Sequence, residues 1–199
     1  MSNKTPRNIL KINSSARYEG SISRGIVDEL IEKLTSNNEN IPVVDRDVIK
    51  GIEFIDETWV SGNFTQKEAR SEIQINKLSY SDALVEEIIT ADTLVIGVPI
   101  YNFGIPAPLK AWFDQIARSN LTFKFIDTGP VGLMTGKKAY VVITSGGTQS
   151  NSEVDYATGY MKQVLEFIGI EDVEFIIADQ LLAGEEAKLK AVHEQIAAL

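Results

Sequence analysis

The chain has 199 residues, of which 44% are hydrophobic and 24% charged, a composition typical of a globular protein with a sizeable core. A formal net charge of −9 disfavours nucleic acid as a partner, because binding a polyanion requires a basic surface. The absence of cysteine excludes disulfides, thiolate nucleophiles and cysteine metal sites. The apolar runs are far shorter than the roughly 20 residues of a membrane-spanning helix, and no signal-peptide pattern precedes the first strand. We therefore expect a single domain over residues 1–199, located in the cytoplasm, with no metal site and no membrane partner.

Short apolar runs alternate along the chain with stretches of helical periodicity, which predict strands and helices in turn. Strands are expected at residues 8–13, 41–48, 93–98, 138–144 and 173–178. Helices are expected at about residues 22–34, 66–90, 106–118, 152–168 and 185–198. Strands that alternate with helices imply right-handed crossovers and a parallel sheet. The predicted fold class is therefore α/β, a flavodoxin-like five-stranded parallel sheet of order 2-1-3-4-5 with helices on both faces.

Two segments, 49–67 and 119–137, have no clean period, yet they are too apolar for solvated loops. No regular element is predicted in either. In the helix at 66–90, four apolar residues are expected to pack inward: Leu84, Val85, Ile88 and Ile89.

The segment 49–67 predicts an assembly, because it carries more large apolar side chains than the core of one sheet has room for. These residues are Ile49, Ile52, Phe54, Ile55, Trp59, Val60 and Phe64. Exposed together, they would form a patch larger than monomers usually tolerate. We expect a homodimer in which the second chain covers this patch and completes the active site. The alternative is that the segment folds over its own sheet as a lid.

The loop after the first strand is rich in hydroxyl groups. It carries Ser14, Ser15, Ser21 and Ser23 but only one glycine, Gly20, so it lacks the glycine pattern of a dinucleotide-binding turn. Hydroxyl groups and free amides at a helix N-terminus are suited to a terminal phosphate. The alternative is simple capping of a surface helix, which accounts for Ser21 alone.

The strand 93–98 leads into Ile100, Tyr101, Asn102 and Phe103 before the next helix begins. Ligands of open α/β sheets bind beyond the carboxyl ends of the strands. Two aromatic side chains and an amide at this position favour a flat ring with polar edges. Alternatively, the aromatic side chains fill the core beside an ordinary turn.

The fourth predicted strand ends in Ser145, Gly146, Gly147 and Thr148, where paired glycines allow backbone amides to approach a ligand closely. A plain turn is the alternative. The loops after strands one, three and four would then bring together hydroxyls for a phosphate, aromatic side chains for a ring and amides for its polar edge. This combination fits a flavin mononucleotide. Because the only histidine, His193, is near the C-terminus, the chemistry must come from a cofactor or from carboxylates.

Several motifs resemble those of the FMN-dependent NADH-azoreductases, which are also quinone reductases, and the resemblance covers nearly the whole chain. The motifs are Pro99-Ile-Tyr-Asn-Phe103, Leu109-Lys-x-x-Phe-Asp114, Thr122-Phe-Lys-Phe125, Gly129-Pro-x-Gly-Leu-x-x-Gly-Lys137 and Phe167-Ile-Gly-Ile170. One position departs from the family, which commonly has Ser-Arg-Gly-Gly after the fourth strand, whereas Gly146 directly follows Ser145 here.

The resemblance implies a role for each motif residue. Ser15, Ser21, Ile22 and Ser23 would hold the ribityl phosphate. Ile100, Tyr101, Asn102 and Phe103 would line the isoalloxazine ring, and Ser145, Gly146, Gly147 and Thr148 its pyrimidine end. Asn102 would be nearest the N5/O4 edge, and Phe125 and Phe167 would flank the substrate.

The implied activity is an FMN-dependent oxidoreductase that uses NADH or NADPH to reduce quinones, azo compounds or both, by two-electron ping-pong transfer through flavin N5. No side chain is expected to be catalytic, because the chemistry takes place on the flavin. A flavodoxin-like electron carrier or redox sensor without turnover is the alternative. A hydrolase without flavin is disfavoured, because no nucleophile and base can be paired around one peripheral histidine.

Overall fold

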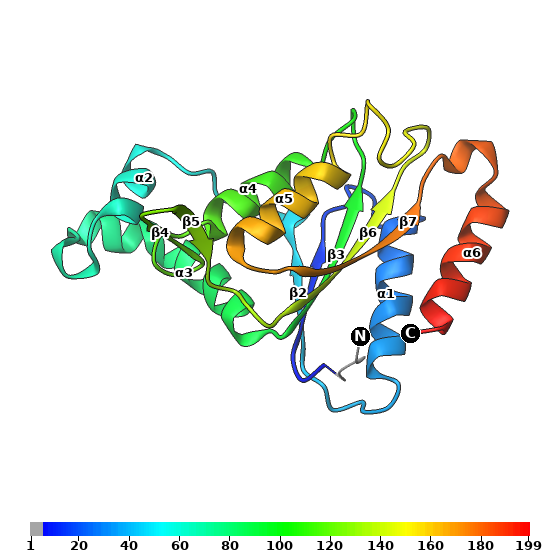
Figure 1. The fold of residues 1–199 in the computed structure, drawn as a ribbon, viewed down its shortest axis with the longest axis horizontal. Helices are drawn as coiled ribbons and strands as arrows, with labels where there is room; N and C mark the ends of the chain where they lie inside the picture. Colours follow the sequence, from blue (N-terminus) through cyan, green and yellow to red (C-terminus); the bar gives the residue numbers. More distant parts are fainter. Residues whose placement is uncertain (1–5) are drawn as a thin grey trace.

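A computed structural model describes residues 6–199, in which five parallel strands form the central sheet in the order β2-β1-β3-β6-β7 (Figure 1). The strands are β1 (Ile9–Asn13), β2 (Val43–Asp47), β3 (Thr93–Pro99), β6 (Lys138–Thr144) and β7 (Asp172–Ala178). Counted within this sheet alone, the order is 2-1-3-4-5. The predicted fold class is therefore confirmed.

Helices cover both faces of the sheet, with α1 and α6 on one face and α3, α4 and α5 on the other (Figure 1). The α-helices are α1 (Ile22–Thr35), α2 (Glu57–Phe64), α3 (Glu72–Thr90), α4 (Ala107–Ile116), α5 (Thr158–Ile168) and α6 (Glu185–Ala197). Three short 3₁₀ helices are η1 (Val48–Lys50), η2 (Lys67–Ala69) and η3 (Leu181–Ala183). No helix within residues 6–199 combines the length and the hydropathy needed to cross a membrane.

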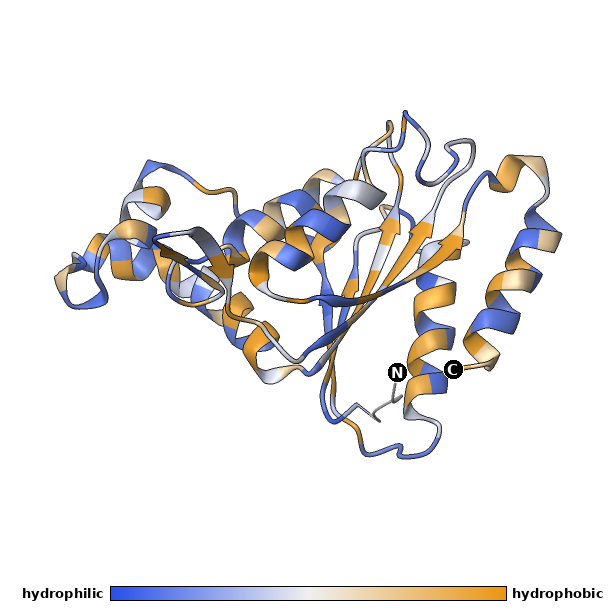
Figure 2. Cartoon of the chain, viewed as in Figure 1, coloured by the Kyte–Doolittle hydropathy of each residue, from blue (hydrophilic) through white to orange (hydrophobic). Residues whose placement is uncertain are grey.

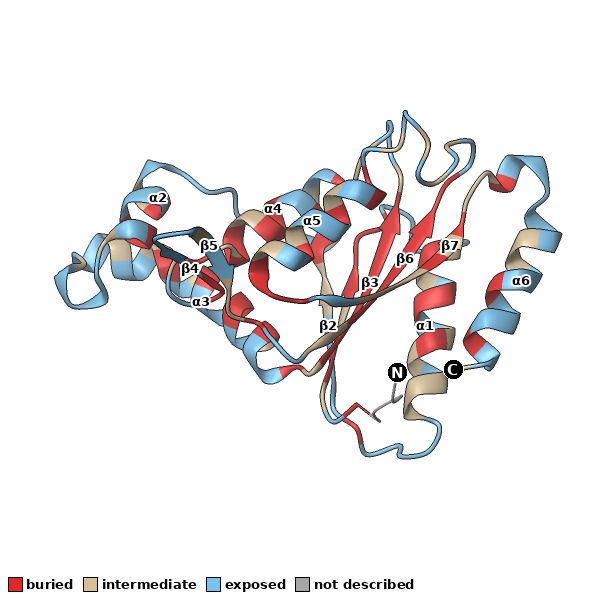
Figure 3. Cartoon of the chain, in the orientation of Figure 1, coloured by how far each residue is buried: buried red, intermediate tan, exposed pale blue. Residues whose placement is uncertain are grey.

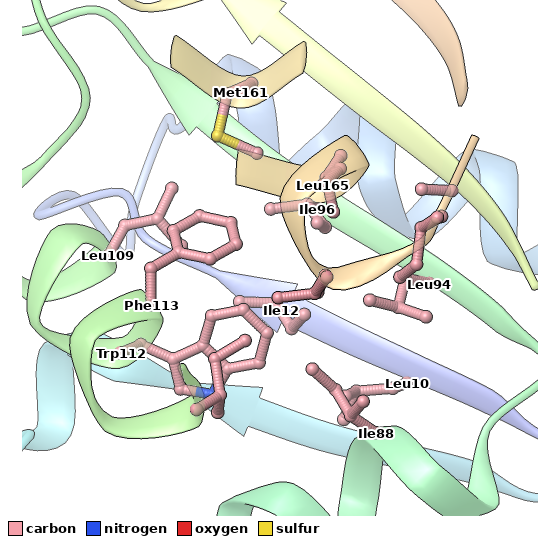
Figure 4. Packing of buried hydrophobic residues seen from close by; sticks show 14 of the residues in the cluster. Leu10, Ile12, Ile88, Leu94, Ile96, Leu109, Trp112, Phe113, Met161 and Leu165 are labelled. Atoms are coloured by element: carbon pink, nitrogen blue, oxygen red, sulfur yellow. The ribbon is translucent and has the colours of Figure 1, made fainter. Parts of the chain in front are cut away.

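The central strand β3 is buried at every position, as its continuous apolar sequence predicts for a parallel strand covered on both faces (Figures 2 and 3). On one face, side chains of α4 and α5 pack over it (Figure 4). The Trp112 and Phe113 rings of α4 meet edge to face, with centroids 5.0 Å apart. Met161 and Leu165 of α5 complete this layer. Each such buried side chain contributes about 1.5–3 kcal/mol to folding.

Two predicted helices begin later than expected, because capping groups set their starts. Helix α3 begins after Ser71, whose side chain and that of Gln74 form a capping box. Helix α5 begins at Thr158, because the Asp155 carboxylate accepts the amides of Ala157 (2.8 Å) and Thr158 (3.0 Å).

Within α3, the expectation for one residue was wrong. Ile89 is exposed, because the buried side of the helix passes through Leu84, Val85 and Ile88 and leaves Ile89 on the flank. The other three residues are buried as predicted.

The segment 49–67 is not irregular throughout, because it contains η1 and α2. Asp56 caps α2 by accepting the amide of Trp59 (2.8 Å). The Trp59 indole donates to the Gln115 side-chain oxygen of α4 (2.8 Å), so its side chain is only 3% exposed. Trp59 is therefore removed from the predicted exposed patch, since it anchors α2 to the body of the protein.

The segment 119–137 contains an antiparallel hairpin of β4 (Phe123–Ile126) and β5 (Gly129–Gly132), which sequence periodicity missed. The hairpin is held against the end of α5. The Met134 amide donates to the Ile168 carbonyl (2.8 Å), and the backbones of Gly132 and Gly169 lie in direct contact. A Cβ placed on Gly132 would be 2.0 Å from the Gly169 nitrogen.

We expect Gly132→Ala to lower the free energy of unfolding by about 3 kcal/mol or more, because the added methyl group meets backbone that cannot rotate away. Gly25→Ala is the matched control: its Cβ would meet nothing within 4 Å, and the change should stabilise α1 by about 0.5–1 kcal/mol. Urea denaturation measures both. Equal midpoints for the two variants would contradict the close backbone contact.

Candidate functional site

The loop after β1 forms a cluster of hydroxyl groups at the N-terminus of α1. The Ser21 hydroxyl donates to the Ser15 hydroxyl (2.9 Å) and lies 3.3 Å from that of Ser23. The Ser15 hydroxyl also accepts the amide of Arg17 (3.2 Å). Ser21 caps the helix as well, accepting the Arg24 amide (3.4 Å). Capping therefore accounts for Ser21 but not for the whole cluster. The cluster lies at the N-terminus of α1, which is the positive end of the helix dipole and favours an anion such as phosphate.

An ion pair that sequence reasoning did not find braces this loop. The Arg24 guanidinium donates to the carbonyls of Ser15 (2.8 Å) and Arg17 (2.9 Å) and to the Asp47 carboxylate at the end of β2 (3.0 Å). No local signal predicts the pair, because the two residues are separated by a helix and a strand. Since Asp47 neutralises Arg24, the brace fixes the shape of the loop and adds little net charge to it.

The brace also responds to pH. Burial by itself would raise the pKa of Asp47, but hydrogen bonds from Arg24 and from the Ile49 amide outweigh it and lower that pKa. The ionised carboxylate therefore contributes stability above the ordinary carboxyl pKa of about 3.9, and this contribution is lost as the pH falls through the lowered value.

The loop after β3 is a tight turn closed by two backbone hydrogen bonds between Tyr101 and Gly104 (3.0 and 3.1 Å). Its central residues, Asn102 and Phe103, have φ values of 47° and 72°, which is the type I′ pattern. Within residues 6–199, nothing accepts a hydrogen bond from either central amide. The side chains of Tyr101, Asn102 and Phe103 are exposed, which excludes the alternative that they fill the core.

The Tyr101 side chain joins this turn to the hydroxyl cluster. Its phenolic oxygen accepts the amide of Ala16 (3.1 Å) and lies 3.4 Å from the Ser15 hydroxyl. The hydroxyl end of Tyr101 therefore belongs to the predicted phosphate loop, although the residue was expected to line the ring. Ile100, at the base of the turn, donates its amide to the Thr144 carbonyl of β6 (2.8 Å).

The loop after β6 completes the arrangement. The buried Ser145 hydroxyl folds the loop, donating to the Thr148 carbonyl and accepting the Gln180 amide (3.0 Å). Gly146 and Gly147 are exposed, and a Cβ on Gly147 would meet nothing within 4 Å.

Further along this loop, the Tyr156 amide donates to the Phe103 carbonyl (2.9 Å), so backbone bonds connect it with the turn after β3. The turn is in this way tied to both neighbouring loops. Figure 1 shows the loops that leave β3 and β6 at the same edge of the sheet.

Phe125 and Phe167 lie away from these loops and form an aromatic cluster with Phe123. The Phe123 centroid is 4.7 Å from that of Phe167 and 5.5 Å from that of Phe125. Phe125 is 64% exposed, whereas Phe167 is half-buried. Helix α5 begins beside the turn after β3 and rises about 14 Å before it reaches Phe167. Phe167 is therefore separated from the turn after β3 by most of the length of this helix.

The groups present fit an FMN molecule. The hydroxyl cluster and the N-terminus of α1 suit its phosphate, the exposed aromatic side chains suit its ring, and the unpaired amides of the turn suit a polar ring edge. Open space over Gly147 allows a flat group to approach the backbone.

Known proteins agree with this geometry. A family model described as a flavodoxin-like fold matches residues 7–199. The FMN-dependent NADH:quinone oxidoreductase 1 of Hahella chejuensis is 50% identical over 190 residues, covering 96% of this chain and 93% of that protein. The protein of the same name from Jannaschia sp. is 49% identical over 191 residues, covering 96% of this chain and 97% of that protein. The chain belongs to the family of FMN-dependent NADH:quinone oxidoreductases.

A solved structure supports the assignment. An FMN-dependent NADH-azoreductase from Bacillus anthracis in complex with FMN has a TM-score of 0.82 and 25% identity, with 95% of each chain covered. The family resemblance found in the sequence is thus confirmed. The prediction that the chain is an FMN-dependent enzyme of the quinone oxidoreductase family is confirmed with it. The roles of individual residues rest on the geometry above and stay predictions.

We expect Tyr101→Phe to weaken FMN binding about fivefold, the effect of losing one hydrogen bond of about 1 kcal/mol. Because the lost hydroxyl lies at the phosphate loop, riboflavin, which lacks the phosphate, should bind the variant and the parent protein almost equally. Fluorescence titration of the apoprotein measures both ligands. Tyr156→Phe, on an exposed ring, is the matched control. Equal weakening for both ligands would place Tyr101 at the ring instead.

Proposed function

We propose that this enzyme reduces quinones with NADH, accepts azo compounds as further substrates, and works by ping-pong transfer of two electrons. Three loops tied together at the carboxyl ends of β1, β3 and β6, with exposed aromatic side chains on one of them, are the observation that supports this most strongly. The relatives from Hahella chejuensis and Jannaschia sp. are named as NADH:quinone oxidoreductases, which agrees with NADH and quinone as substrates. Use of NADH also fits the cytoplasmic location expected from the sequence.

The chemistry comes from the cofactor: bound FMN supplies, at N5, a position that takes hydride from NADH and passes two electrons on to the acceptor. The chain supplies binding and orientation. Ser15, Ser21 and Ser23, with the Ile22 amide, would hold the phosphate, and the amide of Asn102 would stabilise negative charge at the ring edge. Phe103 and the glycine loop position a flat acceptor at reacting distance.

No titratable side chain is required beside the ring. The only histidine, His193, is on α6, where it contacts Glu29 of α1 (2.6 Å) and is half-exposed. Family membership favours an enzyme over the alternative of an electron carrier. A carrier needs an exposed flavin edge and a docking face, but no site for a small acceptor.

Steady-state kinetics tests the proposal. FMN-loaded protein should oxidise NADH rapidly when menadione is added, and double-reciprocal plots at several menadione concentrations should be parallel, as ping-pong transfer requires. Apoprotein without added FMN is the control and should be inactive. Negligible oxidation of NADH with menadione would identify a carrier, and intersecting lines would exclude the ping-pong scheme.

We also propose a homodimer whose active sites combine residues of both chains. Several apolar side chains of the segment 49–67 are exposed, with Phe54 at 75%, and the exposed group also includes Ile55, Val60 and Phe64. Phe167 lies about 14 Å along α5 from the turn after β3, and Phe125 of β4 belongs to the same aromatic cluster through Phe123. We therefore place both rings beside the substrate in the site of a partner. A two-fold partner would bury the patch and bring these rings to the other cofactor.

We expect Phe125→Ala to raise the KM for menadione several-fold without loss of bound FMN, since an aromatic stacking contact is worth about 0.5–1.5 kcal/mol. Ile126→Ala is the control, because Ile126 points to the opposite face of β4. Light scattering of the FMN-loaded protein should give the mass of two chains. A fully active monomer at assay concentration would refute the shared site, and release of FMN from Phe125→Ala would make that residue structural.

A further inference from the structure

One leucine beside the candidate site is almost entirely exposed. Leu182 follows the carboxyl end of β7, and 90% of it is accessible to solvent. Its amide donates to the Gly146 carbonyl (3.0 Å), which fixes it next to the glycine loop. A Cβ on Gly146 would be 3.3 Å from the Leu182 Cδ1 atom, so the leucine side chain covers the position where a side chain at 146 would begin.

Leu182 belongs to an apolar rim formed by exposed side chains of the loops after β3, β6 and β7. We define this rim as Tyr101, Phe103, Tyr156 and Leu182, all of which are exposed. Backbone hydrogen bonds hold its members in fixed positions, from Tyr156 to Phe103 (2.9 Å) and from Leu182 to Gly146 (3.0 Å). Figure 3 shows the loops beyond β3 and β6 as largely exposed. The rim therefore presents apolar surface to any molecule that reaches the ring site.

The segments after β3, β6 and β7, which carry the rim, contain acidic residues and no basic ones, whereas the loop after β1 carries the exposed Arg17. The stretches 99–104, 145–157 and 179–184 contain no lysine or arginine but carry Glu153, Asp155 and Asp179. Burial by itself would raise the pKa of Asp155, but hydrogen bonds from Thr158 and from the amides of Asn151 and Ala157 outweigh it and lower that pKa, so the carboxylate is ionised at neutral pH.

Arg17 is in the loop after β1, at the predicted phosphate end of the site, and the cations nearer to Leu182 are paired or point elsewhere. Lys188 is bound to Asp179 (3.2 Å), and Lys110 to Asp114 (2.6 Å). Lys162 is on the side of α5 that lines a groove toward β7. On β4, which we place in the site of the partner chain, Lys124 points to the face opposite Phe125.

We propose that Leu182 is a specificity-determining residue, which makes the enzyme select uncharged aromatic acceptors over anionic ones such as sulfonated quinones and sulfonated dyes. This inference rests on the proposed function. An uncharged ring buries apolar surface against the rim and gains free energy. A sulfonate would lose water there without meeting a cation, and it would be repelled by the acidic loops.

The test uses two acceptors that differ by one sulfonate group, 1,2-naphthoquinone and 1,2-naphthoquinone-4-sulfonate. The sulfonate also changes the intrinsic reactivity of the quinone, so the informative quantity is the ratio of the two kcat/KM values, compared between variants of the FMN-loaded enzyme. In a ping-pong scheme, the kcat/KM of the acceptor is independent of the NADH half-reaction.

Leu182→Arg should shift this ratio about tenfold toward the sulfonate, because it places a cation at the rim. The shift should shrink at high salt, which screens exposed charges. Leu182→Met keeps an apolar side chain of similar size and should leave the ratio within about twofold. Ala191→Arg adds the same charge on the exposed side of α6 and should also leave it within about twofold. FMN content and thermal midpoint show whether each variant is folded.

The outcomes separate the two proposals. An unchanged ratio in Leu182→Arg, or an equal shift in Leu182→Arg and Ala191→Arg, overturns the role of Leu182 while the quinone reductase activity stands. If the parent enzyme reduces neither quinone, the proposed function fails, and the selectivity proposal falls with it.

Discussion

The architecture of the site depends on one buried strand. Every residue of β3 is buried, and its backbone is paired along Thr93–Gly97 with β1 and along its whole length with β6. Buried backbone that is paired on both sides cannot slide or twist without leaving hydrogen bonds unmade. The carboxyl ends of the three strands therefore stay level, and the loops that leave them meet at one edge of the sheet.

Contacts between residues far apart in the sequence then turn these loops into a single structure. The Tyr101 hydroxyl joins the turn after β3 to the loop after β1, and Arg24 with Asp47 braces that loop from the side of β2. Each contact contributes modestly to folding, on the order of 1 kcal/mol. Their larger effect is preorganisation, because a loop that is already fixed loses less entropy when a ligand binds.

The sequence predicts the features that depend on local patterns, and it does not predict those that depend on contacts between residues far apart in the chain. The apolar run of β3 predicts a buried strand, and the serine cluster predicts a phosphate loop, because both signals are local. Helix α2 was missed because it is short and contains Gly62 and Asn63, which disfavour a helix. The β4–β5 hairpin was missed because glycine and proline make up three of the four residues of β5, so its stability comes from packing against α5 and not from propensity. The Arg24–Asp47 pair has no signal in the sequence around either residue.

The left-handed conformation of Phe103 sets stability against the presence of an aromatic ring at the candidate site. At the second central position of a type I′ turn glycine is strongly preferred, and a bulky residue with a φ of 72° carries backbone strain of about 1–3 kcal/mol. Selection for stability alone would replace the phenylalanine with glycine. The same replacement would remove the exposed aromatic ring from the candidate site. Engineering for heat resistance would meet this conflict at residue 103, because a substitution that relieves the backbone strain also removes the aromatic ring.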